Sequence, residues 1–331
     1  MAKAQIRVGT ASWTDHEPFY PSEYNKASMK SQRIAYYARY FNMVEVDSTF
    51  YRLQPTRNFE LWAERTPPDF VFDVKAYGEL TWHHRDEQNE PIPPSAETFA
   101  KFGEMIQPLR VAGKMGAILF QFPPWYKPTE EHMEYFAAMR ELLPQDTIAV
   151  EFRQRAWLEG RQLDETRAIL KDHDLAFCAV DEPQLGSGSV PPVTMITDPQ
   201  FSMVRFHGRN AKMWYGKNLQ SSRDRFDYLY TADELLPWAE RIERIAEEMG
   251  RGQIHVVTNN NARNYSIVNA LQLQDLLGQP VGKGEPLPEN VDPHMIVESV
   301  SEAVRAAGKS QPKARTNKDA SHAQQQMPGM S

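Results

Sequence analysis

Charged and polar side chains recur at the ends of short apolar runs in this 331-residue chain. Three of them, Glu45, Glu151 and His207, are of types that exchange protons in general acid–base catalysis. Lysine and arginine side chains in the same segments could hold an anionic group, and arginine can bind one with two parallel hydrogen bonds. We therefore predict a site with Glu45, Glu151 and His207 as catalytic residues and with these substrate-binding residues: Ser12, Trp13, Asp47, Tyr51, Lys75, Gln121, Arg153, Trp157, Arg205, Arg209, Asn259 and Asn260.

Eight β-rich runs carry most of these residues, and helical patterns separate most of the runs. Apolar and polar residues alternate within them, as Val44 and Val46 do with Glu45 and Asp47. Alternate residues of a strand share a face, so the apolar faces should pack on helices and the polar faces should converge at one end. The runs cover residues 6–8, 43–47, 70–76, 116–122, 147–152, 175–180, 203–207 and 254–258.

The alternation predicts an α/β protein with a single (β/α)₈ TIM-type barrel. One helix is predicted over Ser31–Phe41, and a capping box at Thr231 predicts the start of another that ends at Gly250. The helix after the sixth strand should be weak or replaced by a loop, because residues 183–199 lack a helical pattern. An open doubly wound sheet is the alternative, but the glycine-rich turn that marks its nucleotide-binding form is missing.

The barrel domain is predicted to span residues 1–278. Residues 279–307 begin with a Pro/Gly-rich stretch and should form a linker that could include one short peripheral helix. Residues 308–331 contain few large apolar residues and should be a disordered basic tail. The formal net charge of −7 therefore understates the acidity of the barrel itself.

The composition limits the compartment and the partners. No apolar run approaches the length of a membrane span and no secretory leader is visible, so we expect a cytoplasmic protein with no membrane partner. The single cysteine, Cys178, excludes an internal disulfide, and its apolar neighbours predict buried packing. Nucleic acid is a disfavoured partner for so acidic a body. Four histidines away from the strand ends should lie at the surface: His16, His132, His173 and His294.

Aromatic residues gather in the segments that follow the strands. Trp13, Trp82, Trp125, Trp157 and Trp214 all do so, joined by several tyrosines. Aromatic rings beside arginine and asparagine suit stacking on a sugar ring or a base, although packing of loops over the barrel would explain each one separately. The expected partner is a small anionic or sugar-like molecule, and the sequence leaves the cofactor unknown.

Ordered motifs at these strand ends resemble the YecE-like family, domain of unknown function 72. They include Gly9-Thr-Ala-Ser-Trp13, Val44-Glu-Val-Asp-Ser-Thr-Phe-Tyr51, Val150-Glu-Phe-Arg153 and Val204-Arg-Phe-His-Gly208. The resemblance covers about residues 6–278 and implies a (β/α)₈ barrel, but no activity, since the family is uncharacterised in reaction and substrate. Asp47 stands where the family usually has asparagine, which argues against a role that needs a neutral amide there.

Three functions remain open from the sequence. The first is an enzyme acting on a polar anionic or sugar-like ligand, including phosphorylated sugars and nucleotides, by acid–base chemistry at the C-terminal mouth of the barrel. Hydrolysis would fit, but Gln121 and Arg205 occupy strands where common barrel glycosidases carry carboxylates, and an isomerase is equally open. The second is a metal-assisted isomerase or endonuclease-like barrel with Glu45, Glu151, Asp181 and His207 as metal ligands. The third is a non-catalytic protein that binds a nucleotide or single-stranded RNA.

Overall fold

The computed structural model describes residues 2–186, 189–216, 222–292 and 295–296. The predicted basic tail, His294 and most of the predicted peripheral helix lie outside the described residues. Among the residues described, no helix combines the length and the apolar character needed to cross a membrane.

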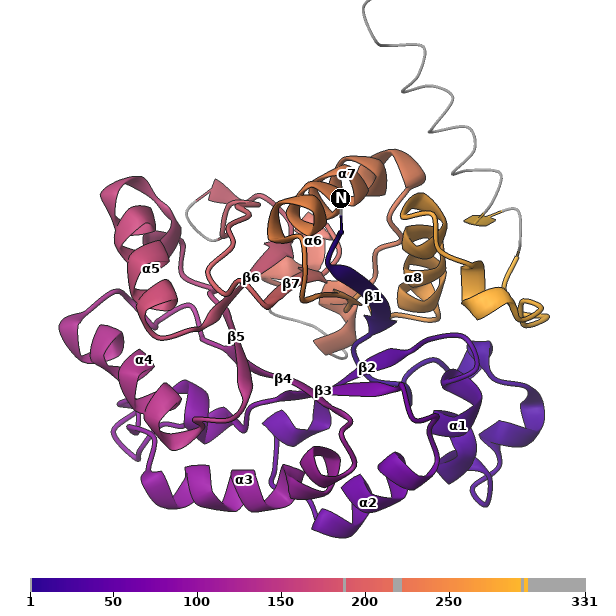
Figure 1. Ribbon diagram of the computed structural model, residues 1–331, viewed down its shortest axis with the longest axis horizontal. Helices are drawn as coiled ribbons and strands as arrows, with labels where there is room; N and C mark the ends of the chain where they lie inside the picture. Colours follow the sequence, from indigo (N-terminus) through magenta and orange to yellow (C-terminus); the bar gives the residue numbers. More distant parts are fainter. Residues whose placement is uncertain (1, 187–188, 217–221, 293–294, 297–331) are drawn as a thin grey trace, which may run out of the picture.

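Eight parallel strands form one sheet that curls into a barrel, with helices on the outside (Figure 1). The strand order is β1-β8-β7-β6-β5-β4-β3-β2. This arrangement confirms the predicted TIM-type fold, and each predicted run overlaps one strand. The strands are β1 (Gln5–Thr10), β2 (Met43–Val46), β3 (Val71–Lys75), β4 (Met115–Gln121), β5 (Thr147–Glu151), β6 (Ala176–Asp181), β7 (Phe201–Phe206) and β8 (Gln253–Thr258).

The barrel closes between β1 and β2 by a short contact. Ala11 and Glu45 form an isolated parallel bridge, and the amide of Ser12 donates to the carbonyl of Glu45 at 2.8 Å. A side chain at Gly9 would bring its Cβ to 2.4 Å from the carbonyl oxygen of Met43, so the close approach of the two strands requires glycine here. In contrast, β1 pairs with β8 along its whole length.

Eight α-helices are described around the sheet, and their packing follows from strand alternation. Val44 and Val46 belong to the hydrophobic core between the strands and the helices, whereas Glu45 points into the barrel and meets Arg205 of β7. The predicted alternation of faces is therefore confirmed in β2. The helices are α1 (Arg33–Tyr37), α2 (Thr56–Glu64), α3 (Ala96–Val111), α4 (Glu130–Leu142), α5 (Gly160–Asp172), α6 (Ala211–Trp214), α7 (Ala232–Met249) and α8 (Tyr265–Leu276).

The helix ends show where local sequence dominates and where tertiary contacts do. The capping box at Thr231 and the left-handed Gly250 bound α7 as predicted. The first helix is shorter than expected, because the hydroxyl of Tyr37 bonds Thr10 and Met43 and the chain turns toward β2 after it. The described residues between β6 and β7 contain no α-helix, as predicted.

Residues 279–292 lie against the barrel. The amide of Gly282 donates to the side chain of Gln274 in α8 at 2.7 Å, and Glu285 forms an ion pair with Arg39 at 2.6 Å. Val291 is buried in the hydrophobic core. The start of the predicted linker therefore packs on α8 and near the end of α1, because its few apolar residues are buried against the barrel.

Candidate functional site

A cavity of about 700 Å³ opens at the carboxyl ends of the strands. Ser12 at its edge adopts φ 65°, a left-handed conformation that costs energy in a non-glycine residue and often marks functional loops. Eight of the predicted site residues line this cavity: Ser12, Trp13, Asp47, Tyr51, Lys75, Gln121, Arg153 and Asn259.

Beneath the cavity lies a set of five side chains that we call the ionic cluster: Glu45, Glu151, Arg153, Arg205 and His207. Arg205 donates Nε and Nη2 to the two oxygens of Glu45 at 2.8 and 2.6 Å, and Nη1 to Glu151 Oε2 at 2.5 Å. All members except Arg153 are fully buried. Buried charges are costly unless they are paired and hydrogen-bonded, and here each carboxylate is paired with an arginine.

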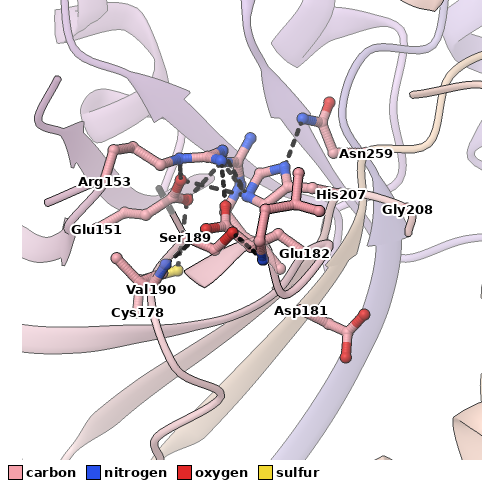
Figure 2. A network of polar contacts seen from close by, with 12 residues as sticks. Glu151, Arg153, Cys178, Asp181, Glu182, Ser189, Val190, His207, Gly208 and Asn259 are labelled. Atoms are coloured by element: carbon pink, nitrogen blue, oxygen red, sulfur yellow. Dashed lines mark hydrogen bonds and ion pairs between the residues drawn. The ribbon is translucent and has the colours of Figure 1, made fainter. Parts of the chain in front are cut away.

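Arg153 connects the ionic cluster to the cavity. Its Nε donates to Glu151 Oε1 at 2.6 Å, Nη1 donates to Glu182 Oε2 at 2.6 Å, and Nη2 lies 2.7 Å from His207 Nε2 (Figure 2). Figure 2 also shows the side chain of Asn259 against the other ring nitrogen of His207, 3.0 Å away. The polar groups at the cavity floor therefore hold one another in place.

The pKa values of the three predicted catalytic residues follow from burial and pairing. Burial alone would raise the pKa of Glu151, but Arg153, Arg205 and His207 outweigh it and hold that pKa well below the usual range. Burial raises the pKa of Glu45, since Arg205 offsets it only in part. Burial and then Arg153 lower the pKa of His207 to about 3. Glu45, Glu151 and His207 do not line the cavity, and their position favours a role in supporting Arg153.

Four further predicted binding residues also lie outside the cavity lining. Arg205 is held within the ionic cluster. Trp157 is buried, donates its indole N–H to the carbonyl of Tyr126 at 2.6 Å and stacks on Phe152. Arg209 pairs with both oxygens of Asp181, at 2.8 and 2.7 Å. The fourth, Asn260, donates to the carbonyl of Tyr228 at 2.8 Å.

Lys75, the last residue of β3, differs from these arginines. Its amine lies 4.5 Å from the centroid of the Phe50 ring, and it makes no hydrogen bond or ion pair with any residue that the structure describes. Burial lowers the pKa of Lys75 and Arg205 adds to this, whereas Asp47 and the buried glutamates oppose it. Lys75 therefore presents an amine at the cavity that is open to a ligand.

Several cavity residues were not among the predicted set. Trp62, expected in a helix core, packs edge-to-face on Trp13 with ring centroids 4.9 Å apart and lines the cavity. Burial lowers the pKa of His83, also a lining residue, to about 3. A position just after a strand is a sequence signal that could have found several of these residues. The cavity-lining residues outside the predicted set are Trp62, His83, Thr14, Asp15, Val46, Ser48, Phe50, Pro124, Glu182, Trp214, Tyr215, Arg225, Phe226 and Asn261.

Comparison with known proteins agrees with this fold. The family model described as "Protein of unknown function DUF72" matches residues 7–292. This chain belongs to the DUF72 family. The UPF0759 protein YunF of Bacillus subtilis is 34% identical over 276 residues, which cover 82% of this chain and 94% of YunF. The matched region extends beyond residue 278, in keeping with the packing of residues 279–292 on the barrel.

Two solved DUF72 structures are similar to this chain. A DUF72 protein from Thermotoga maritima is 31% identical with a TM-score of 0.70, covering 83% of this chain and 100% of that one. A DUF72 protein from Enterococcus faecalis is 26% identical with a TM-score of 0.73, covering 83% of this chain and 96% of that one. The DUF72 family is described as being of unknown function, so the site must be interpreted from its own geometry.

The residues considered as metal ligands are already engaged in this DUF72 chain. Glu45 and Glu151 each use both oxygens on arginines, and Asp181 accepts from Arg209, Tyr230 and Trp238. Over the described ranges, no group of three or more His, Cys, Asp or Glu side chains is arranged to hold a metal ion. Glu45, Glu151 and Asp181 would have to give up arginine contacts to bind one.

Two other residues in this DUF72 chain bear on the sequence predictions. Cys178 is buried as predicted, and burial raises the pKa of its thiol well above the usual range, so it is not a poised nucleophile. The prediction for His16 is wrong: its ring is fully buried, with Nε2 3.2 Å from the carbonyl of Ser12. His16 lies in the loop after β1 with its ring near the hydroxyl of Ser266 in α8, whereas His132 and His173 are partly exposed.

The lowered pKa of His207 predicts a specific acid sensitivity. In the unfolded chain a histidine titrates at about 6.5, so between that pH and about 3 the unfolded state binds one more proton than the folded state. The contribution of His207 to stability is complete above about pH 6.5 and falls below it by up to about 1.4 kcal/mol per pH unit. Urea unfolding of the wild type and His207→Gln at pH 7, 6 and 5 should show the smaller decline in the variant. Parallel declines would contradict the prediction.

Proposed function

We propose that this DUF72 protein is an enzyme acting on a small sugar-like molecule that carries an anionic group, by acid–base chemistry in the cavity at the barrel mouth. The observation that carries the proposal is the amine of Lys75, which faces an aromatic-walled cavity without a partner among the described residues. Burial lowers the pKa of Lys75, and a lysine amine with a lowered pKa can accept and return a proton during a reaction.

The walls of the cavity suit a ring with polar edges. Trp13, Trp62, Trp214 and Tyr215 contribute apolar faces on which a sugar ring can stack, and Asp47, Gln121 and Asn259 supply hydrogen-bonding groups. A few fixed polar groups on a mainly apolar surface are typical of small-molecule sites. These residues support a sugar-like ligand over a purely apolar one.

Two arginines support the anionic part of the proposed ligand. Arg153 uses one N–H on each of its three nitrogens within the described residues, so each terminal nitrogen keeps a second N–H for a ligand. Arg225, which also lines the cavity, is exposed and makes no hydrogen bond or ion pair to another described residue. A phosphate or carboxylate could be bound by both.

Binding of ribose 5-phosphate, ribose and inorganic phosphate, measured by calorimetry, tests the proposal. We expect ribose 5-phosphate to bind most tightly, because it engages the aromatic walls and the arginines together. Arg225→Met should weaken the binding of ribose 5-phosphate by about tenfold or more, because one hydrogen bond to a charged group is lost. The affinity for ribose should not change.

The matched control is Arg251→Met, which removes an exposed arginine just before β8, at the opposite end of the barrel. It should leave all three ligands unaffected. Proton NMR of the bound mixtures would then detect turnover. If none of the three ligands binds, or Arg225→Met and Arg251→Met behave alike, the proposal fails; tight binding with no conversion would instead favour the non-catalytic binder.

A further inference from the structure

We infer that Lys75 is a covalent nucleophile, which forms an iminium with the carbonyl carbon of an aldehyde or of an open-chain sugar in the barrel-mouth cavity. The inference rests on the proposed function and deepens it, because it names the reacting group of the ligand and the atom of the protein that attacks it.

The backbone around Lys75 is held so that its amine reaches the cavity from a fixed position. The carbonyl of Lys75 accepts from the hydroxyl of Thr49 at 2.6 Å, and the amide of Ala76 donates to the carbonyl of Leu119 at 2.9 Å. Lys75 also ends a strand of the barrel wall. A nucleophile placed on a rigid element needs little ordering when the carbonyl arrives.

A second lysine shows what a structural amine looks like in this chain. Lys114 is buried, and its amine donates three hydrogen bonds, to the carbonyls of Ala63 and Thr66 and to the hydroxyl of Thr66, at 2.6–2.9 Å. Three acceptors satisfy an ammonium group completely. Lys75 has none of these among the described residues, which leaves its nitrogen available to react.

Burial of Lys75 at the barrel mouth favours the neutral amine that an attack on a carbonyl requires. Burial lowers the pKa of Lys75, and the guanidinium of Arg205 in the ionic cluster lowers it further. Asp47 opposes this lowering most strongly, and Glu45 and Glu151 also oppose it, although both glutamates are bound to arginines. A lysine in partly desolvated surroundings near another cation is the recognised form of an activated amine nucleophile.

Asp47 is placed to move protons during such a reaction. Val46, the last residue of β2, faces Val74 of β3; Asp47 directly follows Val46, Lys75 directly follows Val74, and the charge of Asp47 acts on the Lys75 amine. Both line the cavity. A carboxyl group in the same cavity as the reacting nitrogen can donate a proton to the departing oxygen and take it back later.

The step balances without an oxidant or reductant. The lone pair of the Lys75 nitrogen forms a bond to the carbonyl carbon, and one proton passes from nitrogen to the carbonyl oxygen to give a carbinolamine. A further proton, supplied from solvent through Asp47, joins the hydroxyl group, which leaves as water. The nitrogen lone pair then forms the C=N bond of the iminium.

Reductive trapping with glyceraldehyde and sodium cyanoborohydride at pH 7 tests the inference on the full chain. Peptide mapping by mass spectrometry should find the reduced adduct on Lys75 at least about tenfold faster than on the exposed Lys101 of α3, because the Lys75 amine is activated by burial and has no partner among the described residues, whereas Lys101 is paired with Glu97. Lys75→Arg, which keeps the charge, should abolish the fast adduct. Lys101→Arg should leave the fast adduct intact, and circular dichroism of both variants will check that they fold.

An adduct spread evenly over the surface lysines, or one whose rate survives Lys75→Arg, overturns the inference. Calorimetry with ribose 5-phosphate separates this failure from that of the proposed function. If ribose 5-phosphate binds and Arg225→Met weakens it while Lys75 stays unmodified, only the covalent step is wrong. If ribose 5-phosphate does not bind and Lys75 stays unmodified, both proposals fail.

Discussion

Replacing Arg205 by methionine should reduce the free energy of unfolding by about 3–5 kcal/mol. The guanidinium donates three hydrogen bonds to Glu45 and Glu151, and all three side chains are fully buried. Its removal leaves two carboxylates without that partner in a place that water does not reach. Urea unfolding at pH 7 measures the loss, which should shrink at pH 5 because the freed carboxylates then take up protons more readily in the folded state.

The matched control is Arg161→Met in α5. Arg161 also forms an arginine–carboxylate pair, with Glu165 at 2.8 Å, but its side chain is 92% exposed. Exposed pairs of this kind contribute about 0.5 kcal/mol or less. Adding Glu45→Gln to Arg205→Met should recover part of the stability, because it removes one stranded charge. If Arg161→Met and Arg205→Met lost equal free energy of unfolding, the ionic cluster would contribute no more to stability than an exposed ion pair.

Replacing Arg153 by methionine should raise the pKa of His207, now about 3, by about one to three pH units. Burial is the main cause of the low value, and Arg153 is the next; without it, Glu151 at 3.2 Å from the ring would attract the imidazolium. NMR titration of the His207 ring, assigned with His207→Gln, measures the change. The same variant should lose several kcal/mol of stability, because Glu151 and Glu182 both lose a partner.

Arg155→Met serves as the control for Arg153. Arg155 lies two residues further along and pairs with Glu159 on the surface, and it does not contact His207. The pKa of His207 should be unchanged in Arg155→Met. An unchanged value in Arg153→Met as well would mean that burial alone determines the titration of His207.

Strand alternation predicted the barrel and the inward direction of its charged side chains. Glu45, Glu151 and Arg205 do point into the barrel, because their neighbours are the apolar residues that pack on the helices. Alternation contains no information about distance across the barrel. It could not show that Arg205 meets Glu45, 160 positions earlier in the chain, and so is held away from a ligand.

Residues that follow the strands were harder to predict, because each loop takes its own path. Trp13 and Trp157 both come after strands, yet Trp13 lines the cavity while Trp157 packs beneath Tyr126. Arg209 follows β7 but turns to Asp181. A residue type and its distance from a strand end identify a candidate, but only tertiary contacts decide whether its side chain reaches the cavity.

The closure of the barrel has a consequence for how this chain is made. The chain at the end of β1 bridges to β2 at Ala11 and Glu45, whereas β1 pairs with β8 along its full length, from Gln5 with Gln253 to Thr10 with Thr258. During synthesis at 5–20 residues per second, β1 leaves the ribosome roughly 250 residues, or on the order of 10–50 s, before that partner. Until then, the edge of β1 that includes Ile6 and Val8 has no β8 to pair with. The cavity therefore reaches its final form only after the last strand has been translated.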